Sequence, residues 1–258
     1  RASLHHATPV SDTNKPTSAT EMRTRAMLQS SMPQNHPANK LNPEAFQQGL
    51  VTHPDRSFEH RIVTACTEGV DIGYRGPRFY REHNNWQSAT KHASAVQDNI
   101  IKDLQAGFTI GPFSSPPFEH FVGSPLGAFQ KKHSQKYRVI HDLSWPSGSH
   151  SINDHIDIEE FHMHYLSLDE VVSFIKQLGR DALLAKLDLE NAFKYIPVRK
   201  QDWELLGYTF NMFDPLTESY QKMYFCDVVL QFGGRSSPKL FNDFEDAAQF
   251  IMEFYGTS

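Results

Sequence analysis

"LLAKLDLENAFKYIPV", residues 183–198, is the stretch that decides the fold. An apolar run leads to a single carboxylate, Asp188, and a phenyl ring, Phe193, follows five residues later. We expect residues 181–189 to form a strand that is mostly buried on both faces. One interpretation makes Asp188 the N-cap of a short helix, since Asp is a favoured N-cap residue. The other interpretation makes it a metal ligand at the carboxyl end of the strand, and the rest of the chain has to decide between them.

Composition places the chain among globular proteins, with 258 residues, 39% hydrophobic and 12% aromatic. The formal net charge is −5, so any nucleic-acid binding has to come from local clusters of Lys and Arg. The two cysteines, Cys66 and Cys226, give neither a disulfide framework nor a Cys-rich zinc site, and we expect them to be buried apolar fillers. No apolar run reaches the roughly 20 residues of a membrane-spanning helix, and the first residues lack an apolar signal core. We therefore expect a soluble, intracellular protein of the cytoplasm or nucleus with no membrane partner.

Secondary-structure signals run along most of the chain. Residues 1–40 contain no aromatic residue and are rich in Ser, Thr, Asn, Pro and Ala, so we expect a disordered tail. Further along we expect helices at 94–107, 167–179 and 236–256, a strand at 136–143, a hairpin of 203–210 and 222–230, and a loop at 112–129. The apolar stripe of the last helix predicts packing against a sheet. Helices mixed with hairpins, rather than strict strand–helix alternation, predict an α+β fold.

Two further stretches have the composition of binding segments. "FQKKHSQKYRVIHDL", residues 129–143, gathers four cations within eight residues: Lys131, Lys132, Lys136 and Arg138. On its own this run is either a solvated basic hairpin or an arm that grips phosphates, with Arg138 offering bidentate contacts. "LQFGGRSSPKLF", residues 230–241, places two adjacent glycines before a helix. That pattern is either an ordinary tight turn or a place where the backbone approaches a ligand closely.

Taken in order, these stretches resemble reverse transcriptases, most closely those of DIRS-type retrotransposons, which move with a tyrosine recombinase. Residues 124–154 are similar to the family's fingers segment, 183–198 to the motif with the first catalytic aspartate, and 230–241 to the Gly-rich motif that follows. "HPDRSF" and "IGYRGPR", upstream, are similar to the family's N-terminal extension. The resemblance implies an N-terminal extension at 41–120. It also implies the fingers and partial palm of a right-hand polymerase at 121–258.

The resemblance implies two-metal nucleotidyl transfer, in which carboxylates clamp Mg²⁺ or Mn²⁺ ions. Asp188 would be the catalytic aspartate and, together with the carbonyl of Leu189, a metal ligand. Phe193 would lie under the sugar of the incoming deoxynucleotide and exclude a ribose 2′-hydroxyl. The implied nucleotide-binding residues are Lys132, Arg138, Phe193, Phe232 and Gly233, and the implied nucleic-acid-binding residues are Lys131, Lys136 and Arg235. The implied partners are an RNA template, an RNA–DNA or DNA duplex, and deoxynucleoside triphosphates.

The chain departs from the family's pattern at several positions. Gln130 and Gln231 stand where the family usually has proline, Gly234 replaces a larger apolar residue, and Lys194 replaces a common arginine. The family's aromatic-x-Asp-Asp hairpin, which supplies further carboxylates, is not in the sequence. We expect the parent reading frame to reach it within a few tens of residues beyond Ser258. Truncated before that hairpin, this chain alone is expected not to extend a primer.

Two other functions remain open at this point. A non-catalytic nucleic-acid-binding remnant would keep the basic arm without the chemistry, and would bind duplexes with a strong salt dependence. A metal-dependent hydrolase would use Asp188 and nearby histidines, namely His162 and His164 in "FHMHY" with His150 and His155. These histidines show no regular ligand spacing with a fourth partner, so we favour scattered residues over a zinc site.

Overall fold

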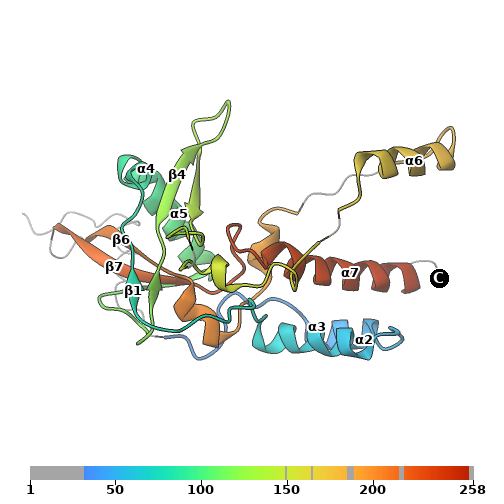
Figure 1. The fold of residues 1–258 in the computed structure, drawn as a ribbon, viewed down its shortest axis with the longest axis horizontal. Coiled ribbons are helices and arrows are strands. Elements are labelled where there is room, and N and C mark those ends of the chain that lie inside the picture. Colours follow the sequence, from blue (N-terminus) through green and yellow to red (C-terminus); the bar gives the residue numbers. More distant parts are fainter. Residues whose placement is uncertain (1–31, 149, 164, 185–188, 215–217, 256–258) are drawn as a thin grey trace, which may run out of the picture.

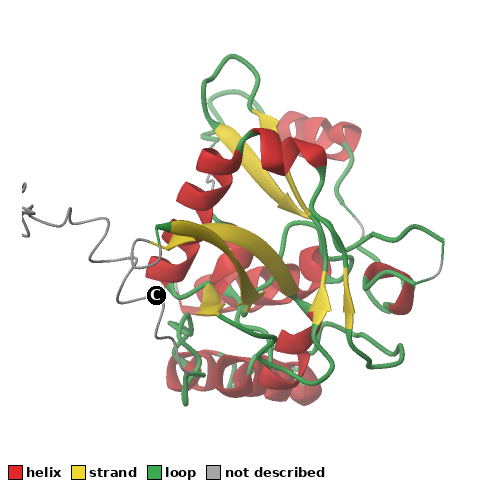
Figure 2. Cartoon of the chain, turned by 90° about the vertical axis from the view of Figure 1, so that its left-hand side faces the viewer, coloured by secondary structure: helices red, strands yellow, loops and turns green. Residues whose placement is uncertain are grey.

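The computed structural model describes residues 32–148, 150–163, 165–184, 189–214 and 218–255. The fold is α+β, as the sequence predicts, and combines a five-stranded mixed sheet with a separate two-stranded antiparallel hairpin. The loop of that hairpin rises on one side of the body, and helices α2 (Pro43–Gly49) and α3 (Arg56–Glu68) lie on the opposite side (Figures 1 and 2). In these described segments, no helix combines the length and apolar character needed to cross a membrane.

The larger sheet has the strand order β1–β3–β6–β7–β2. Its strands are β1 (Arg81–Glu82), β2 (Thr109–Phe113), β3 (Val122–Gly123), β6 (Gly207–Asp214) and β7 (Ser219–Asp227). The predicted hairpin is confirmed, because β6 and β7 pair antiparallel along their whole lengths. The pairing also takes in much of the segment 211–219, which was expected to be the connection. Phe213 and Tyr220 form a cross-strand aromatic pair there, with ring centroids 5.5 Å apart, and such pairs extend a ladder.

The start of that hairpin was predicted four residues too early. Residues Lys200–Leu205 form a 3₁₀ helix, η3, instead of strand. Trp203 is buried in the core, and its indole Nε1–H donates to the carbonyl of Val198 at 2.7 Å. This bond joins two residues that are five positions apart and holds the chain between them in a helical turn. The extended backbone therefore begins only at Gly207.

The smaller sheet pairs β4 (Leu126–Gln130) with β5 (Tyr137–His141). The strand predicted at 136–143 is confirmed, but the loop predicted at 112–129 is wrong, since this segment holds β3, most of β4 and the end of β2. Its glycines were taken as turn signals. A Cβ on Gly123 would lie 3.1 Å from the ring of Phe121, so glycine in this strand makes room for a neighbouring side chain.

Two predicted helices are confirmed around the sheet. They are α5 (Ala93–Ala106) and α7 (Ser237–Tyr255), and the short α4 (Gln87–Lys91) precedes α5. Gly107 ends α5 in the left-handed conformation at φ 77°, which is the usual reason for glycine at this position. The packing of α7 against a sheet stays a prediction, because the strand expected to receive it includes residues 185–188, outside the described residues; α7 lies beside α2 and α3 (Figure 1). Phe244 of α7 meets Phe46 of α2 edge to face, with centroids 5.7 Å apart.

Residues 32–40, the end of the expected disordered tail 1–40, are packed against the body. Ala38 is buried in the main core, and His36 lies 5.3 Å from the indole of Trp203, edge to face. The His36 Nε2–H donates to the carbonyl of Val228 at 2.7 Å, and the amide of Asn39 donates to the carbonyl of Cys66 at 2.5 Å. The remaining residues of the expected tail, 1–31, lie outside the described residues.

Helix α6 (Leu168–Leu178) begins with the predicted capping box, in which Ser167 and Glu170 bond each other's backbone amides. The helix stands away from the rest of the molecule (Figure 1), and its apolar face is exposed. The buried strand expected at 181–189 is wrong in its described part, since Leu183 is 98% exposed and residues 181–184 form no strand. An apolar run is buried only where another surface covers it, and residues 181–184 belong to neither of the two sheets.

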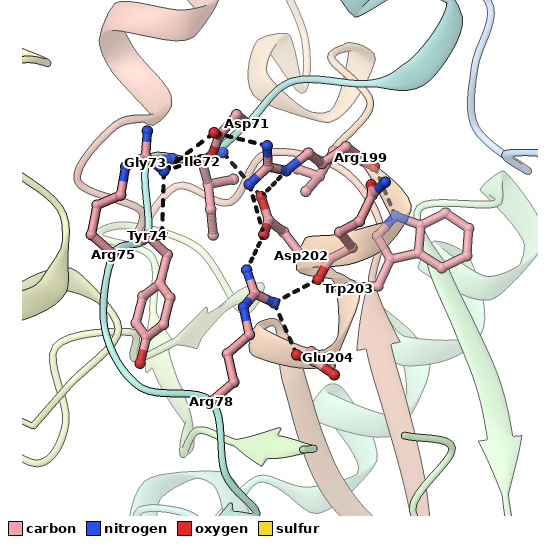
Figure 3. A network of polar contacts seen from close by, with 12 residues as sticks. Asp71, Ile72, Gly73, Tyr74, Arg75, Arg78, Arg199, Asp202, Trp203 and Glu204 are labelled. Atoms are coloured by element: carbon pink, nitrogen blue, oxygen red, sulfur yellow. Dashed lines mark hydrogen bonds and ion pairs between the residues drawn. The ribbon is translucent and has the colours of Figure 1, made fainter. Parts of the chain in front are cut away.

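A network of buried charges joins the segment 70–78 to η3 (Figure 3). Asp202 is fully buried, and Arg78 and Arg199 approach its carboxylate from two sides at 2.6 and 2.8 Å. The backbone N–H of Ile72 adds a third hydrogen bond at 3.3 Å. A buried carboxylate is tolerated when its oxygens are paired in this way. These contacts therefore fix the segment before β1 to η3, which directly precedes β6.

The Asp202→Ala variant should unfold more easily by about 3–5 kcal/mol, because it leaves two arginines without their buried carboxylate. Chemical denaturation followed by circular dichroism measures the loss. Glu204→Gln is the matched control, since Glu204 bonds only Arg78 and glutamine keeps an acceptor oxygen for it. Equal losses in both variants would contradict a dominant role for Asp202.

Candidate functional site

A cavity of about 620 Å³ opens between α5, the edge of β5, the 3₁₀ helix η2 (Ala192–Tyr195) and the turn at 231–233. Polar and charged side chains from all four elements reach its wall. They include Asn99 and Asp103 of α5, Lys131 and Arg138 of the hairpin, Asn191 and Lys194 of the η2 segment, and Gln231 of the turn. The cavity therefore lies where segments far apart in the sequence meet.

Four of the residues singled out from the sequence line this cavity: Lys131, Arg138, Phe232 and Gly233. Phe193 contacts the same wall, since its ring lies 4.9 Å from that of Phe232. A second aromatic contact, 5.5 Å to Phe241 of α7, holds Phe193 from behind. The structure thus brings together residues of three separate stretches of the sequence, 129–143, 183–198 and 230–241.

Other predicted residues lie away from the cavity wall. Lys132 and Lys136 are exposed in the turn between β4 and β5, where the N–H of Lys131 donates to the carbonyl of Lys136 at 2.9 Å. Arg235 is directed toward the body, since its Nη1 donates to the carbonyl of Ile156 at 3.2 Å. Its own backbone N–H donates to Asn153 at 2.8 Å. Arg235 therefore supports the turn through one guanidinium nitrogen, and its side chain is exposed, so its predicted contact with nucleic acid stays a prediction.

Gly233 is required by a close approach of two backbones. A Cβ at this position would lie 2.7 Å from the carbonyl oxygen of His141, a distance that side chains do not tolerate. The bond from the amide of Asn153 to the Gly233 carbonyl, at 2.8 Å, holds the turn on the other side. The Gly-Gly pair thus serves packing of the turn onto β5, and it leaves the exposed ring of Phe232 at the cavity.

An ion pair closes the inner side of the cavity. The Lys194 ammonium donates to both carboxylate oxygens of Asp103 at 2.7 Å, and both side chains are largely buried. Burial raises the pKa of Asp103 above its usual value, although the Lys194 charge acts in the opposite direction. The Lys194 ammonium also lies 5.5 Å from the ring centroid of Phe108, a cation–π contact. Lysine at position 194 is therefore a structural partner of α5.

A second buried pair connects the two sheets below the cavity. The Nδ1 of His141 lies 2.9 Å from Asp227 on β7, and its Nε2 lies 3.1 Å from the carbonyl of Gly207 at the start of β6. The hydroxyl of Thr109 on β2 donates to the other oxygen of Asp227 at 2.5 Å. Burial raises the pKa of the adjacent Tyr208 well above its usual value, so this phenol stays neutral. Both His141 and Asp227 line the cavity.

The metal ligands expected from the resemblance are not tested by this geometry. Asp188 lies outside the described residues, and Leu189, its expected co-ligand, is 60% exposed. Within the described ranges, no group of three or more His, Cys, Asp or Glu residues could hold a metal ion. His164 lies outside these ranges, while His162, His150 and His155 form no such group inside them. Cys66 and Cys226 are buried free thiols, as predicted.

Sequence reasoning missed Asp103, His141 and Asp227 as parts of the cavity. Asp103 and Lys194 are 91 residues apart, and His141 and Asp227 are 86 residues apart. No local pattern marks such pairs.

Lys194→Met should destabilise the protein at pH 7 by about 3 kcal/mol, because it leaves the buried Asp103 carboxylate without its cation. The pKa of Asp103 is already raised by burial, and losing Lys194 raises it further. The cost therefore shrinks as the pH falls and both folded and unfolded chains carry a protonated carboxyl. Urea denaturation at pH 7 and near pH 4 measures the two differences from the wild type. Lys91→Met, at an exposed lysine of α4, is the control, and a loss independent of pH would contradict this role of Asp103.

Comparison with known proteins adds no family to this geometry. No protein-family model matches the chain, and no curated protein matches it either. The arrangement of the cavity and the resemblance of its segments are therefore the grounds on which a function is proposed.

Proposed function

We propose that the chain is part of an RNA-directed DNA polymerase of a retroelement and that the cavity receives the incoming deoxynucleoside triphosphate. One observation carries the proposal. Arg138 and Phe232 line a single cavity and Phe193 packs against the ring of Phe232, although the three residues come from separate stretches resembling reverse transcriptases. Chance resemblance in three stretches gives no reason for their side chains to converge.

In this proposal, cations of the hairpin bind the triphosphate. Arg138 stands on a strand, so its planar guanidinium is presented in a fixed direction and can bond two phosphate oxygens at once. Lys131 lines the same wall, and Lys132, in the neighbouring turn, adds positive charge. The Lys194 charge is already neutralised by Asp103 and contributes little to the phosphates.

The aromatic wall of the cavity would receive the sugar and base. Phe193 is held between Phe232 and Phe241, so its ring cannot swing aside easily. A fixed ring under the sugar leaves no room for a 2′-hydroxyl, which selects deoxynucleotides by exclusion. In the proposed enzyme, Mg²⁺ or Mn²⁺ held at Asp188 would polarise the attacking hydroxyl and neutralise the phosphates.

The second candidate function is a non-catalytic nucleic-acid-binding remnant. It is favoured by the exposed turn of the hairpin, where Lys131, Lys132 and Lys136 form no ion pair with any acid in the described part of the chain. Such a remnant binds RNA–DNA duplexes in a salt-dependent way but does not bind free nucleotides at the cavity.

Titration of the chain with a fluorescent deoxynucleoside triphosphate in the presence of Mg²⁺ distinguishes the two functions. A polymerase cavity should bind the nucleotide, and Arg138→Gln should weaken binding about 10- to 100-fold by removing charge-assisted hydrogen bonds. Arg61→Gln, at an exposed arginine of α3, is the control and should leave the affinity unchanged. Absence of nucleotide binding together with salt-dependent duplex binding would favour the remnant.

Phe193→Ala should relax the preference for deoxynucleotides over ribonucleotides about 10-fold or more, because it removes the ring that meets the 2′-hydroxyl. The ratio of the two dissociation constants, measured on the same preparation, reports the change. Phe213→Ala is the control, since Phe213 is a partly exposed ring on β6 that does not line the cavity. A ratio that stays constant in Phe193→Ala would make Phe193 an ordinary core aromatic.

A further inference from the structure

Three large aromatic side chains lie partly exposed beside the β4–β5 hairpin: Phe129 on β4, Trp86 at the N-cap of α4 and Trp145 in the loop after β5. Phe129 is 55% exposed, and Trp86 and Trp145 are each 38% exposed. A single exposed aromatic residue needs no explanation. Three neighbouring exposed aromatic residues do need one, and we call Phe129, Trp86 and Trp145 the aromatic strip.

The three rings form a continuous surface. Gly127 of β4 lies between two of them, since a Cβ there would be 3.2 Å from the ring of Phe129 and 3.4 Å from that of Trp86. Trp145 continues the strip, with its ring centroid 4.8 Å from that of Trp86 and the planes at 72°. The absence of a side chain at Gly127 keeps the strip low at its centre, so a flat group can lie across it.

The aromatic strip is held rigidly. The backbone N–H of Trp86 donates to the carbonyl of Leu126 at 3.0 Å, and its indole N–H donates to Asp142 at 3.2 Å. The hydroxyl of Ser88, one residue into α4, accepts from the N–H of Ala128 at 3.2 Å. Trp86 is thus fixed to the start of β4 and to Asp142, the residue after β5, and ordering its ring on binding costs little further entropy.

Positive charge borders the aromatic strip. In the hairpin register, Arg138 lies directly opposite Phe129, and Lys131 and Lys136 follow after the pair of Gln130 and Tyr137. The one acid beside the rings, Asp142, is engaged by the indole of Trp86. Arg138 also lines the cavity, so the strip and the cavity adjoin each other across β5.

We propose that the aromatic strip stacks the bases of an unpaired RNA strand, with the strand's phosphates on Lys132 and Lys136, the exposed cations of the turn that do not line the cavity. Aromatic rings interleaved with cations are what single-strand binding requires, because every base offers a π-face and every nucleotide a phosphate. A duplex keeps its bases stacked inside and cannot use the rings. The inference rests on the proposed function in one respect: the RNA strand would be the template, and β5 would lead it to the nucleotide cavity.

Intrinsic fluorescence tests the proposal directly, because the chain has three tryptophans and only two lie in the strip. The third, Trp203, is 1% exposed and cannot stack with a ligand. An unpaired oligoribonucleotide of about 12 nucleotides, within the ~4–16-nucleotide sites of single-strand binders, should quench the Trp86 and Trp145 emission. An RNA duplex of the same length should leave it largely unchanged.

Variants of the strip give the affinity test. Trp86→Leu and Phe129→Leu should each weaken binding of the labelled single strand about 10-fold in fluorescence anisotropy, with less than a twofold effect on the duplex. Phe129→Tyr keeps a ring and should retain the affinity. Phe213→Leu is the matched control, since Phe213 is also 38% exposed but lies on β6, and thermal melting confirms that each variant is folded.

Each other outcome overturns the proposal. Unchanged single-strand affinity in both leucine variants, or no quenching by RNA, would show that the rings are not used. Equal losses for single strand and duplex would show that the surface reads phosphates alone. Strip variants should also keep the wild-type affinity for the fluorescent nucleotide. A wild-type chain that binds no nucleotide would refute the proposed polymerase function while leaving the RNA titrations interpretable.

Discussion

The buried contact between His141 and Asp227 is the interaction on which the site depends. It is the point where the hairpin is fixed to the larger sheet, because the imidazole faces Asp227 of β7 with one nitrogen and Gly207 of β6 with the other. Without it, β5 would have no polar attachment at the level of the cavity floor, and the edge that carries Arg138 would be free to shift. Because Gly233 has no Cβ, the turn at 231–233 packs directly against the carbonyl of His141. The cavity is the space left between these two attachments.

Features that depend on local chemistry could be predicted from the sequence. The capping box at Ser167 and Glu170, the end of α5 at Gly107 and the β6–β7 hairpin each follow from residues a few positions apart. The convergence of the basic stretch, Phe193 and Phe232 could be anticipated only through resemblance, since nothing in their separate patterns places them together.

Features that depend on distant partners could not be predicted. Gly123 was placed in a loop and Gly207 inside a strand, and neither pattern indicated that the ring of Phe121 fills the space where their side chains would lie. The apolar stripe of α7 indicated a buried face but not that α2 and α3 lie beside it. Leu183 shows the converse case, because an apolar side chain is buried only when another surface is there to receive it. Charge pairs such as Asp103 with Lys194 are invisible for the same reason.

The network around Asp202 has a consequence for the order in which the protein is made. Arg78 and its carboxylate partner are 124 residues apart in the chain. At ribosomal rates of ~5–20 residues per second, the arginine is synthesised roughly 6–25 s before Asp202. During that interval Arg78 has neither of its native carboxylate partners, Asp202 and Glu204. Residues 70–78 thus take up their native contacts only after η3 has been synthesised.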